Sequence, residues 1–432
     1  MTSKTGRTVK VDYIARVEGE GALDIEVRDG SIQRLLLKIF EPPRFFQGFL
    51  VGRKYDEVNE IVSRICGICP VSHQVTSLMA IEDAMGVKVS KRTLKLRRLL
   101  ALAQWIQSHT LHVYMLAAPD FLGAESVVEL ASTHPDAVKR ALMLKRLGND
   151  LTAAVGGREV HPVTPVVGGF TSLPNRNTML ELRKRLVDAM DDAMATATLV
   201  STFPVPDFSW DAEHVAMRGE GEYPVNHGRL VSNKGLNITP QEYRTFIKEK
   251  QVAHSNALHS YVYGRGSFMV GPLPRLNLNL DNLGDAAKHA MKCTGVDFPS
   301  RNPFHSAAAR AVEIVQAVDD CIHLIDEIDW EGLDDRSHLI ARGQGYAFTE
   351  APRGTLYHSY RIDRDGYVEF ADIVTPTAQN LNNIEEDLRR LLPSFLDLPD
   401  DDMTLKCEMT VRNYDPCISC SAHFLKVRVR RV

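Results

Sequence analysis

Two Cys-x-x-Cys motifs lie near opposite ends of the chain, and they constrain its fold more than any other feature. The first is Cys66-Gly-Ile-Cys69 and the second is Cys417-Ile-Ser-Cys420. Four thiolates together form a donor set that suits nickel, iron or zinc. If the two pairs share one site, the fold must bring the first and last parts of the chain together around a metal.

The separation of the pairs argues against their commonest use, a structural zinc site. Zinc ribbons and fingers place two pairs within roughly 15 to 20 residues, so that the ion fixes one small knuckle. A closed zinc site also needs no charged side chains beside it. Here almost the whole chain separates the pairs, and Arg64 and Asp415 flank them. The flanking residues must therefore decide between the metals, and a zinc-binding scaffold is the alternative.

The composition excludes several classes of protein. With 432 residues, 44% of them hydrophobic and 25% charged, the chain can bury a large core. Its formal net charge of -4 gives no basic field, so nucleic acid is not a predicted partner. No apolar run reaches the roughly eighteen residues of a membrane span, and the first residues lack the apolar core of a signal peptide. We therefore predict a cytoplasmic protein.

The cysteine count also indicates a reducing compartment. Seven is an odd number, and four of the seven lie in the two pairs, so metal ligation explains the pattern better than a disulfide framework. Cys293, Cys321 and Cys407 are then predicted to be small core residues.

Hydrophobic periodicity predicts an α+β fold that is predominantly α. Alternation in residues 1–45 predicts a small antiparallel sheet with a turn at Asp29-Gly30. A hairpin is predicted at Asp365-Gly366, and an irregular subdomain at 203–275, where periodic signals are few. Helical periodicity predicts helices over residues 90–118, 135–155, 178–201, 306–328 and 384–392. We expect one domain spanning 1–432, a long buried helical bundle with small antiparallel β elements at its rim.

Seven separate blocks, in order along the chain, resemble the large, catalytic subunit of nickel-iron hydrogenases. They are Arg16-Val-Glu18-Gly19, Arg64-Ile-Cys66-Gly-Ile-Cys69 with His73, His112–Asp120, Gly156–Gly169, Glu350-Ala-Pro-Arg-Gly354, Pro376-Thr-Ala-Gln-Asn380 and Asp415-Pro-Cys417-Ile-Ser-Cys420-Ser-Ala-His423. Residues 41–46 and 270–275 are most similar to the cytosolic, bidirectional branch that exchanges electrons with NAD(P). The resemblance implies an oxidoreductase that reversibly oxidises dihydrogen.

The resemblance also implies the ligands of a Ni-Fe(CN)2CO centre. Cys66 and Cys417 would be terminal thiolates on nickel, and Cys69 and Cys420 would bridge to an iron that also carries carbon monoxide and cyanide. Polarisable sulfur donors suit a metal that changes oxidation state.

A magnesium ion is implied near this centre, at a position where the chain departs from the family. Its ligands would be Gln47, the Ile373 carbonyl and His423, but the family usually has glutamate where this chain has Gln47. A neutral amide oxygen is a weaker donor to a hard cation, so we expect the site to be weakened.

Five residues are implied in catalysis. Cys417 would accept the proton released by heterolytic cleavage of dihydrogen, and Glu18 would relay it outward. Arg353 would stand over the open metal position as a fixed cation, with Asp120 and Asp415 holding its guanidinium.

Three more residues are implied in cofactor binding. The backbone near Pro352 and the Thr377 hydroxyl would donate to the cyanides, and His73 would donate to a bridging sulfur.

Taken singly, most of these residues have a simpler structural explanation. Glu18 could be a turn carboxylate bound to Arg16, Asp120 a helix N-cap, and His109 and His112 core histidines. Only the cysteine pairs stand out alone. A rival function is that of a scaffold such as the related quinone-reductase subunit, which shares the fold but normally lacks the metal cysteines.

Partners are implied by what the chain lacks. No cysteines remain in the spacing of an iron-sulfur chain, and no Gly-x-Gly-x-x-Gly follows a predicted strand, so an iron-sulfur small subunit and flavin- and NAD(P)-binding diaphorase subunits are expected. The alternative acceptor is a deazaflavin. The resemblance further implies a nickel chaperone and a maturation protease that cleaves after His423 and releases residues 424–432. The alternation of apolar and basic residues in 424–432 equally fits an edge strand.

Overall fold

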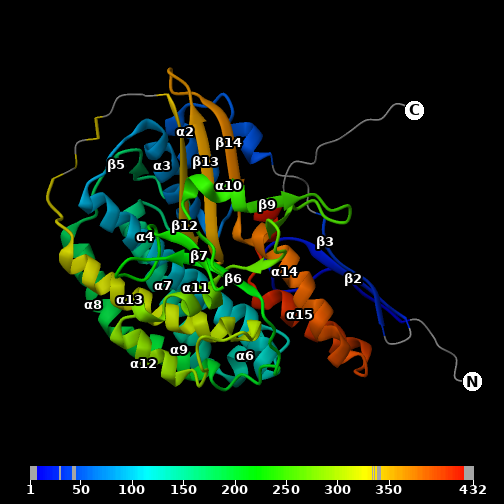
Figure 1. The fold of residues 1–432 in the computed structure, drawn as a ribbon. Coiled ribbons are helices and arrows are strands. Elements are labelled where there is room, and N and C mark those ends of the chain that lie inside the picture. Colours follow the sequence, from blue (N-terminus) through cyan, green and yellow to red (C-terminus); the bar gives the residue numbers. More distant parts are fainter. Residues whose placement is uncertain are drawn as a thin grey trace, which may run out of the picture.

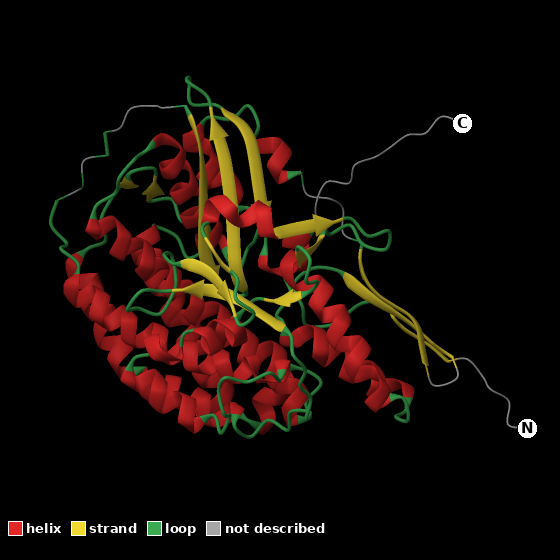
Figure 2. Ribbon diagram, viewed as in Figure 1, coloured by secondary structure: helices red, strands yellow, loops and turns green. Residues whose placement is uncertain are grey.

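Long helices form the body of the protein, and a three-stranded sheet stands beside them (Figures 1 and 2). The computed structural model describes residues 7–28, 31–40, 45–332, 334, 336–337 and 342–422. The helices of the body are α4 (Lys91–Leu111), α7 (Pro135–Gly156), α8 (Arg176–Asp188), α9 (Met190–Val200), α12 (Asp285–Cys293) and α13 (Ser306–Glu327). The α+β, mainly helical fold class predicted from periodicity is confirmed.

The N-terminal strands form the predicted antiparallel sheet, in the order β1 (Arg7–Val11), β2 (Gly21–Arg28) and β3 (Ser31–Ile39). In Figure 1 this sheet extends from the body as a separate ribbon. The predicted turn at Asp29-Gly30 lies outside the described residues. The loop between β1 and β2 carries Arg16 and Glu18 back toward the body.

A second antiparallel sheet is built from β12 (Gly343–Ala351), β13 (Gly354–Ile362) and β14 (Val368–Val374), the last two forming the predicted hairpin. Helices α2 (Tyr55–Ser63) and α3 (Pro70–Met85) lie beside this sheet (Figure 1). A Cβ atom at Gly345 would overlap the Ala80 carbonyl of α3, so glycine lets strand and helix backbones meet directly. This contact packs the second half of α3 against the sheet, and the same helix carries Cys69 of the first cysteine pair at its N-terminus.

Two predicted helices are interrupted. Ser90 caps the helix at 90–118 as predicted, because its side chain accepts from the Thr93 N–H, but α4 ends at Leu111. A π-helical turn at His112–Ala117 follows, and then α5 (Ala118–Leu122). Pro119 lacks an N–H and crowds the preceding turn, which accounts for the widened helix. The helix predicted at 178–201 is split into α8 and α9 at Ala189, where no glycine or proline marks the break.

Residues 203–275 are more regular than predicted. They contain a four-stranded sheet, in the order β11-β6-β7-β8, and the β9–β10 hairpin. The strands are β6 (Glu213–Arg218), β7 (Arg229–Ser232), β8 (Asn237–Ile238), β9 (Ile247–Lys250), β10 (His259–Val262) and β11 (Phe268–Met269). Segments of two to six residues are too short to show a period, so hydrophobic periodicity did not reveal them.

The helix predicted at 384–392 begins earlier, as α14 (Pro376–Leu391), and α15 (Asp400–Asn413) was not predicted. The first half of α14 carries the buried polar residues Thr377, Gln379 and Asn380, which interrupt its apolar pattern. The remaining short elements are α1 (Phe46–Leu50), α6 (Val127–Thr133), α10 (Tyr243–Phe246), α11 (Pro272–Leu278), α16 (Ile418–Ser421), β4 (Pro165–Val166) and β5 (Gly169–Phe170).

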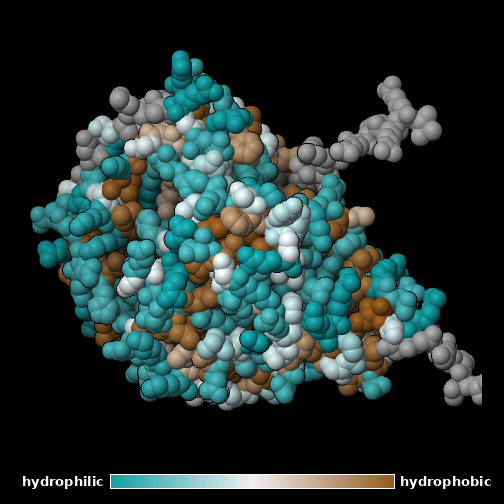
Figure 3. All heavy atoms as spheres, in the orientation of Figure 1, coloured by the Kyte–Doolittle hydropathy of each residue, from teal (hydrophilic) through white to brown (hydrophobic). Residues whose placement is uncertain are grey.

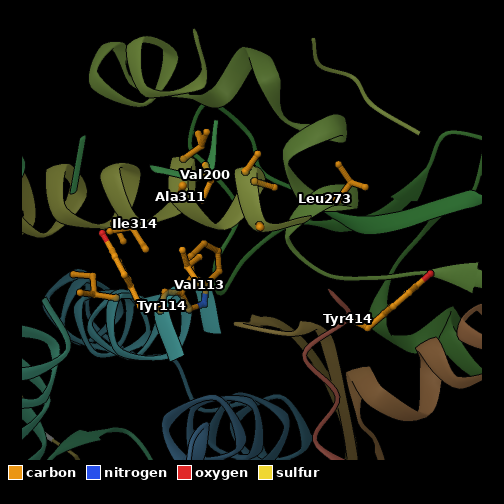
Figure 4. Close-up of a cluster of buried hydrophobic side chains, with 14 of the residues drawn as sticks. Val113, Tyr114, Val200, Leu273, Ala311, Ile314 and Tyr414 are labelled. Atoms are coloured by element: carbon orange, nitrogen blue, oxygen red, sulfur yellow. The ribbon is translucent and has the colours of Figure 1, made fainter. Parts of the chain in front are cut away.

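The main hydrophobic core lies between the helices. Figure 4 shows part of it, where Val113 and Tyr114 from the π-helical turn approach Ile314 of α13. On the face drawn in Figure 3, hydrophilic residues predominate and hydrophobic ones form small patches between them. Among the described residues, no helix is both long enough and apolar enough to cross a membrane.

Candidate metal centre

The two cysteine pairs meet, as predicted. Cys69 lies at the N-terminus of α3, and Cys417 and Cys420 lie at and within the short helix α16. The sulfur atoms of Cys66 and Cys417 are 3.5 Å apart, and Cys417 and Cys420 form a disulfide. All four side chains are buried. Ligand atoms of Cys66, Cys417 and Cys420 lie within 4.8 Å of one another, as do those of Cys69, His73 and Cys420, so one buried sulfur cluster is formed from both ends of the chain.

The two sulfurs of the first pair differ in acidity. A hydrogen bond from the Cys69 side chain and the positive charge of Arg353, acting against burial, lower the pKa of Cys66 to about 7. The backbone N–H groups of Ile68 and Cys69 also donate to the Cys66 sulfur, at 3.4 and 3.2 Å. The hydrogen bond to Cys66, together with burial, raises the pKa of Cys69. Cys66 is therefore the readier of the two to become a thiolate, the form that binds metals.

The Arg353 guanidinium lies beside this cluster. Its Nε donates to the Asp415 carbonyl at 2.7 Å, one terminal nitrogen donates to the Asp415 carboxylate at 3.1 Å, and the other is 4.0 Å from the Cys66 sulfur. Burial tends to raise the pKa of Asp415, but the charges of Arg353, His112 and Arg310 outweigh it and lower that pKa. The pair is thus held ionised in the interior, and Arg353 is a fixed cation beside the sulfurs.

The turn between β12 and β13 fixes the position of Arg353. Gly354 follows it with φ 133°, and a Cβ atom there would come within 2.8 Å of the Gly271 nitrogen. Below the turn, the buried guanidinium of Arg275 donates to the Glu350 carboxylate and the Ala351 carbonyl, at 2.7 and 2.9 Å. The turn that presents Arg353 is therefore held from inside the protein.

The prediction that Asp120 holds Arg353 is wrong. Both Asp120 oxygens accept from Arg412 of α15, at 2.8 and 2.9 Å, and Arg16 binds the same carboxylate. These two guanidinium groups occupy Asp120, and Asp415 alone supplies the carboxylate for Arg353 among the described residues. Asp120 instead joins the loop that carries Glu18 to the helix that precedes Asp415.

Glu18 contacts the second cysteine pair, as the resemblance implied. Its carboxylate lies 3.0 Å from the Cys417 sulfur and accepts from the Ser419 N–H at 3.2 Å. Its backbone carbonyl accepts from the Ile418 N–H at 2.8 Å. Glu18 is only half-buried, so its carboxylate links the enclosed sulfur to the outside of the chain.

Two of the predicted cofactor-binding residues, Thr377 and His73, also adjoin the cluster. The Thr377 hydroxyl oxygen accepts from the Cys417 N–H at 2.9 Å, which leaves the hydroxyl hydrogen available to another acceptor. The Pro352 carbonyl accepts from Arg275 at 3.3 Å. His73, within reach of the Cys69 and Cys420 sulfurs, shares a 3.2 Å hydrogen bond with His358.

Several buried partners were not predicted. His358 bonds Tyr360 at 2.7 Å, and burial, with the neighbouring His73, lowers the pKa of His358, so the ring is neutral. The only sequence signal for this pair was that His358 and Tyr360 are two residues apart, a spacing that places both on one face of a strand. Arg275 pairs with Glu313 of α13 at 2.7 Å, and His109 lies 2.9 Å from the same Glu313 carboxylate. No local pattern links these last three residues, because they come from separate helices.

The predicted magnesium position is also assembled, in part. The Gln47 side-chain N–H donates to the Ile373 carbonyl at 3.1 Å. His423 and residues 424–432 lie outside the described residues.

Comparisons with known proteins agree with this site. The family model for nickel-dependent hydrogenases matches residues 44–140 and 284–423, more than half of the chain. Sulfhydrogenase 1 subunit alpha of Pyrococcus furiosus is 34% identical, over 97% of this chain and 98% of that protein. NAD-reducing hydrogenase HoxS subunit beta of Cupriavidus necator is 28% identical, over 97% and 95%. A crystal structure of an NAD+-reducing [NiFe]-hydrogenase in the H2-reduced state superposes with a TM-score of 0.87 at 27% identity, over 98% of this chain and all of that one.

The chain belongs to the nickel-dependent hydrogenase family. It is the large, catalytic subunit of a nickel-iron hydrogenase, an oxidoreductase that oxidises dihydrogen.

Proposed function

We propose that the enzyme cleaves dihydrogen heterolytically and reversibly, and passes electrons through an iron-sulfur small subunit and diaphorase subunits to NAD(P). The observation that carries the proposal is the placement of the Cys417 sulfur, 3.5 Å from the Cys66 sulfur and 3.0 Å from the Glu18 carboxylate, with Arg353 beside the same cluster. The likeness to two NAD-linked hydrogenases supports the acceptor and a cytoplasmic location.

The donor set fits the metal centre. Cys66 and Cys417 would hold nickel, and Cys69 and Cys420 would bridge to an iron that carries carbon monoxide and cyanide. When bound, such a centre supplies an open position at which dihydrogen is polarised and its electrons are taken up. Metal binding needs thiolates, so Cys417 and Cys420 would both be reduced in the loaded enzyme. The Thr377 hydroxyl and the backbone near Pro352 would donate to the cyanides, and His73 to a bridging sulfur.

The chain's own groups would then move the proton. The Cys417 sulfur accepts it, and the adjacent Glu18 carboxylate takes it toward the surface. The Arg353 guanidinium, fixed by Asp415, keeps positive charge beside the reacting molecule and needs no reorganisation during the reaction.

We assign no magnesium ion. The Gln47 amide N–H already satisfies the Ile373 carbonyl, and a neutral amide replaces the carboxylate that would balance the ion's charge. Gln47 and Ile373 therefore form a hydrogen bond with each other and do not provide a site for a hard cation.

Metal and acceptor analysis of the purified complex tests this function. We expect stoichiometric nickel and iron, infrared bands of bound carbon monoxide and cyanide, and hydrogen-dependent reduction of NAD+ or NADP+. Zinc alone in the large subunit would contradict the proposal. Reduction of a deazaflavin but neither nicotinamide would overturn the acceptor only.

Replacing Glu18 with glutamine should slow hydrogen oxidation about 10²-fold or more, because an amide keeps the shape of the group but cannot accept a proton. Nickel and iron contents should stay at wild-type levels, since Glu18 is not among the proposed ligands. Hydrogen-dependent dye reduction and metal analysis measure both. Glu60→Gln, which changes a largely exposed carboxylate on α2, is the control and should keep full activity. A wild-type rate in Glu18→Gln would rule out the relay.

We also propose that nickel loading is followed by cleavage after His423, with a nickel chaperone and a maturation protease acting on this chain. Intact-mass spectrometry of active, metal-loaded enzyme should show a large subunit that lacks residues 424–432. If all nine residues are retained in active enzyme, the segment is not a maturation peptide.

A further inference from the structure

Two histidines and a glutamate cluster away from the cysteine site. Glu385 lies on α14, His259 is the first residue of β10, and His254 lies in the loop between β9 and β10. One ligand atom from each of the three side chains lies within 4.8 Å of the other two. The His254 Nε2 is 2.9 Å from a Glu385 carboxylate oxygen, and the Leu37 N–H of β3 donates to that same oxygen at 3.0 Å. The carboxylate is therefore already oriented by the backbone.

The buried imidazole of His259 has unsatisfied hydrogen-bonding groups. Its side chain is 1% exposed, and neither ring nitrogen has a hydrogen-bond partner among the described residues. Burying an imidazole without a partner costs free energy that a ligand would recover. Burial, together with the neighbouring charges of His254 and Lys250, lowers the pKa of His259 to about 3. The ring is thus neutral at physiological pH, which is the form that coordinates metals.

We propose that His254, His259 and Glu385 bind a divalent cation of the zinc class, separate from the nickel-iron centre. Two imidazoles and one carboxylate are an established zinc donor set, with ligand distances of about 2.0 to 2.2 Å. Separations within 4.8 Å need only small side-chain movements to close around such an ion. The Leu37 N–H supplies the outer hydrogen bond that fixes a ligating carboxylate.

The position of the cluster indicates a structural role for the ion. It would join the β9–β10 hairpin to α14, and Glu385 also accepts from the Leu37 N–H of β3. The same connection pairs with the C-terminal segment, because Ala257 and Ala422 form an antiparallel bridge two residues after Cys420. On α14, Thr377 bonds the Cys417 N–H. An ion at this site would therefore stiffen the elements that seat the second cysteine pair, while remaining outside the reaction itself.

Zinc titration of the purified hydrogenase complex tests the site. After treatment with a mild chelator that leaves nickel and iron in place, calorimetry and metal analysis should show one zinc bound per large subunit. Zinc should also raise the Tm of the complex, since it binds the folded form. Zinc X-ray absorption should report two imidazole ligands. His259→Gln should weaken zinc binding at least 10-fold and abolish the Tm shift, with hydrogen oxidation unchanged.

Two variants make the outcome decisive. His323→Gln, which changes a histidine on α13 that is 67% exposed, is the control for adventitious surface binding. This variant should bind zinc like the wild type, because His323 is not among the proposed ligands. Glu385→Gln keeps an acceptor for the Leu37 N–H but loses the charge, so it should weaken zinc binding even if His259→Gln fails to fold. The proposal is overturned if the wild type takes up no zinc, or if both His259→Gln and Glu385→Gln bind it with wild-type affinity.

Discussion

Replacing Cys417 with alanine should abolish both hydrogen turnover and nickel retention. Its sulfur lies between the Cys66 sulfur at 3.5 Å and the Glu18 carboxylate at 3.0 Å, so one substitution removes a proposed nickel ligand and the proposed proton acceptor. Three remaining sulfurs cannot complete the four-thiolate donor set. Nickel content by mass spectrometry and hydrogen-dependent dye reduction should both fall to background, while the folded state persists.

Cys407→Ala is the matched control for this experiment. Cys407 is as buried as Cys417, but it belongs to α15 and packs in the main hydrophobic core. Burial, with the nearby Glu408 charge, raises the pKa of Cys407 to about 12, so it is a thiol rather than a metal-binding thiolate. We expect this variant to keep its nickel and most of its activity. Nickel at wild-type stoichiometry in Cys417→Ala would refute the ligand assignment.

Replacing Arg353 with lysine should lower the rate of hydrogen oxidation by about 10²- to 10³-fold while both metals are retained. Lysine keeps the charge but cannot reproduce the two hydrogen bonds through which Arg353 grips the carbonyl and carboxylate of Asp415. The cation would then no longer be fixed beside the sulfurs, and fixed donors at a reacting centre contribute rate factors of this size. Hydrogen-dependent dye reduction and nickel and iron contents give the two readouts.

Arg361→Lys changes an exposed arginine on β13, the strand that follows the turn carrying Arg353, and should leave the rate unchanged. Loss of nickel from Arg353→Lys would mean that Arg353 holds the cysteine cluster together. A wild-type rate in that variant would mean that its charge, rather than its fixed geometry, is all that the reaction requires.

Much of the site could be predicted because its residues lie in short motifs with a chemical meaning. Each cysteine pair was predicted to supply half of the ligands of one metal site, and the structure brings sulfurs of the two pairs into contact. Arg353 and Asp415 lie next to proline and glycine residues that fix local backbone geometry, and they meet as expected. Periodicity likewise placed the helices that bury an apolar stripe.

The features that were predicted wrongly or not at all share a physical cause. Asp120 was predicted to pair with Arg353, but it pairs with Arg412 and Arg16. The sequence alone does not show which of these three arginines lies nearest to the Asp120 carboxylate. The short strands of 203–275 are held by neighbours distant in sequence, so they carry no period of their own. The π-helical turn at His112–Ala117 holds about one extra residue, and Pro119 alone does not tell from the sequence whether the helix before it widens, kinks or ends.

By itself, therefore, the sequence determined the family, the helical fold class and the identity of the sulfur donors, since residue type and local spacing decide these. Only the tertiary structure decided which charged groups pair, how Arg275 holds the turn beneath Arg353, and that His254, His259 and Glu385 converge. Those choices depend on distances between side chains from separate elements. Such distances follow from how the helices and sheets pack, and no stretch of the chain contains them.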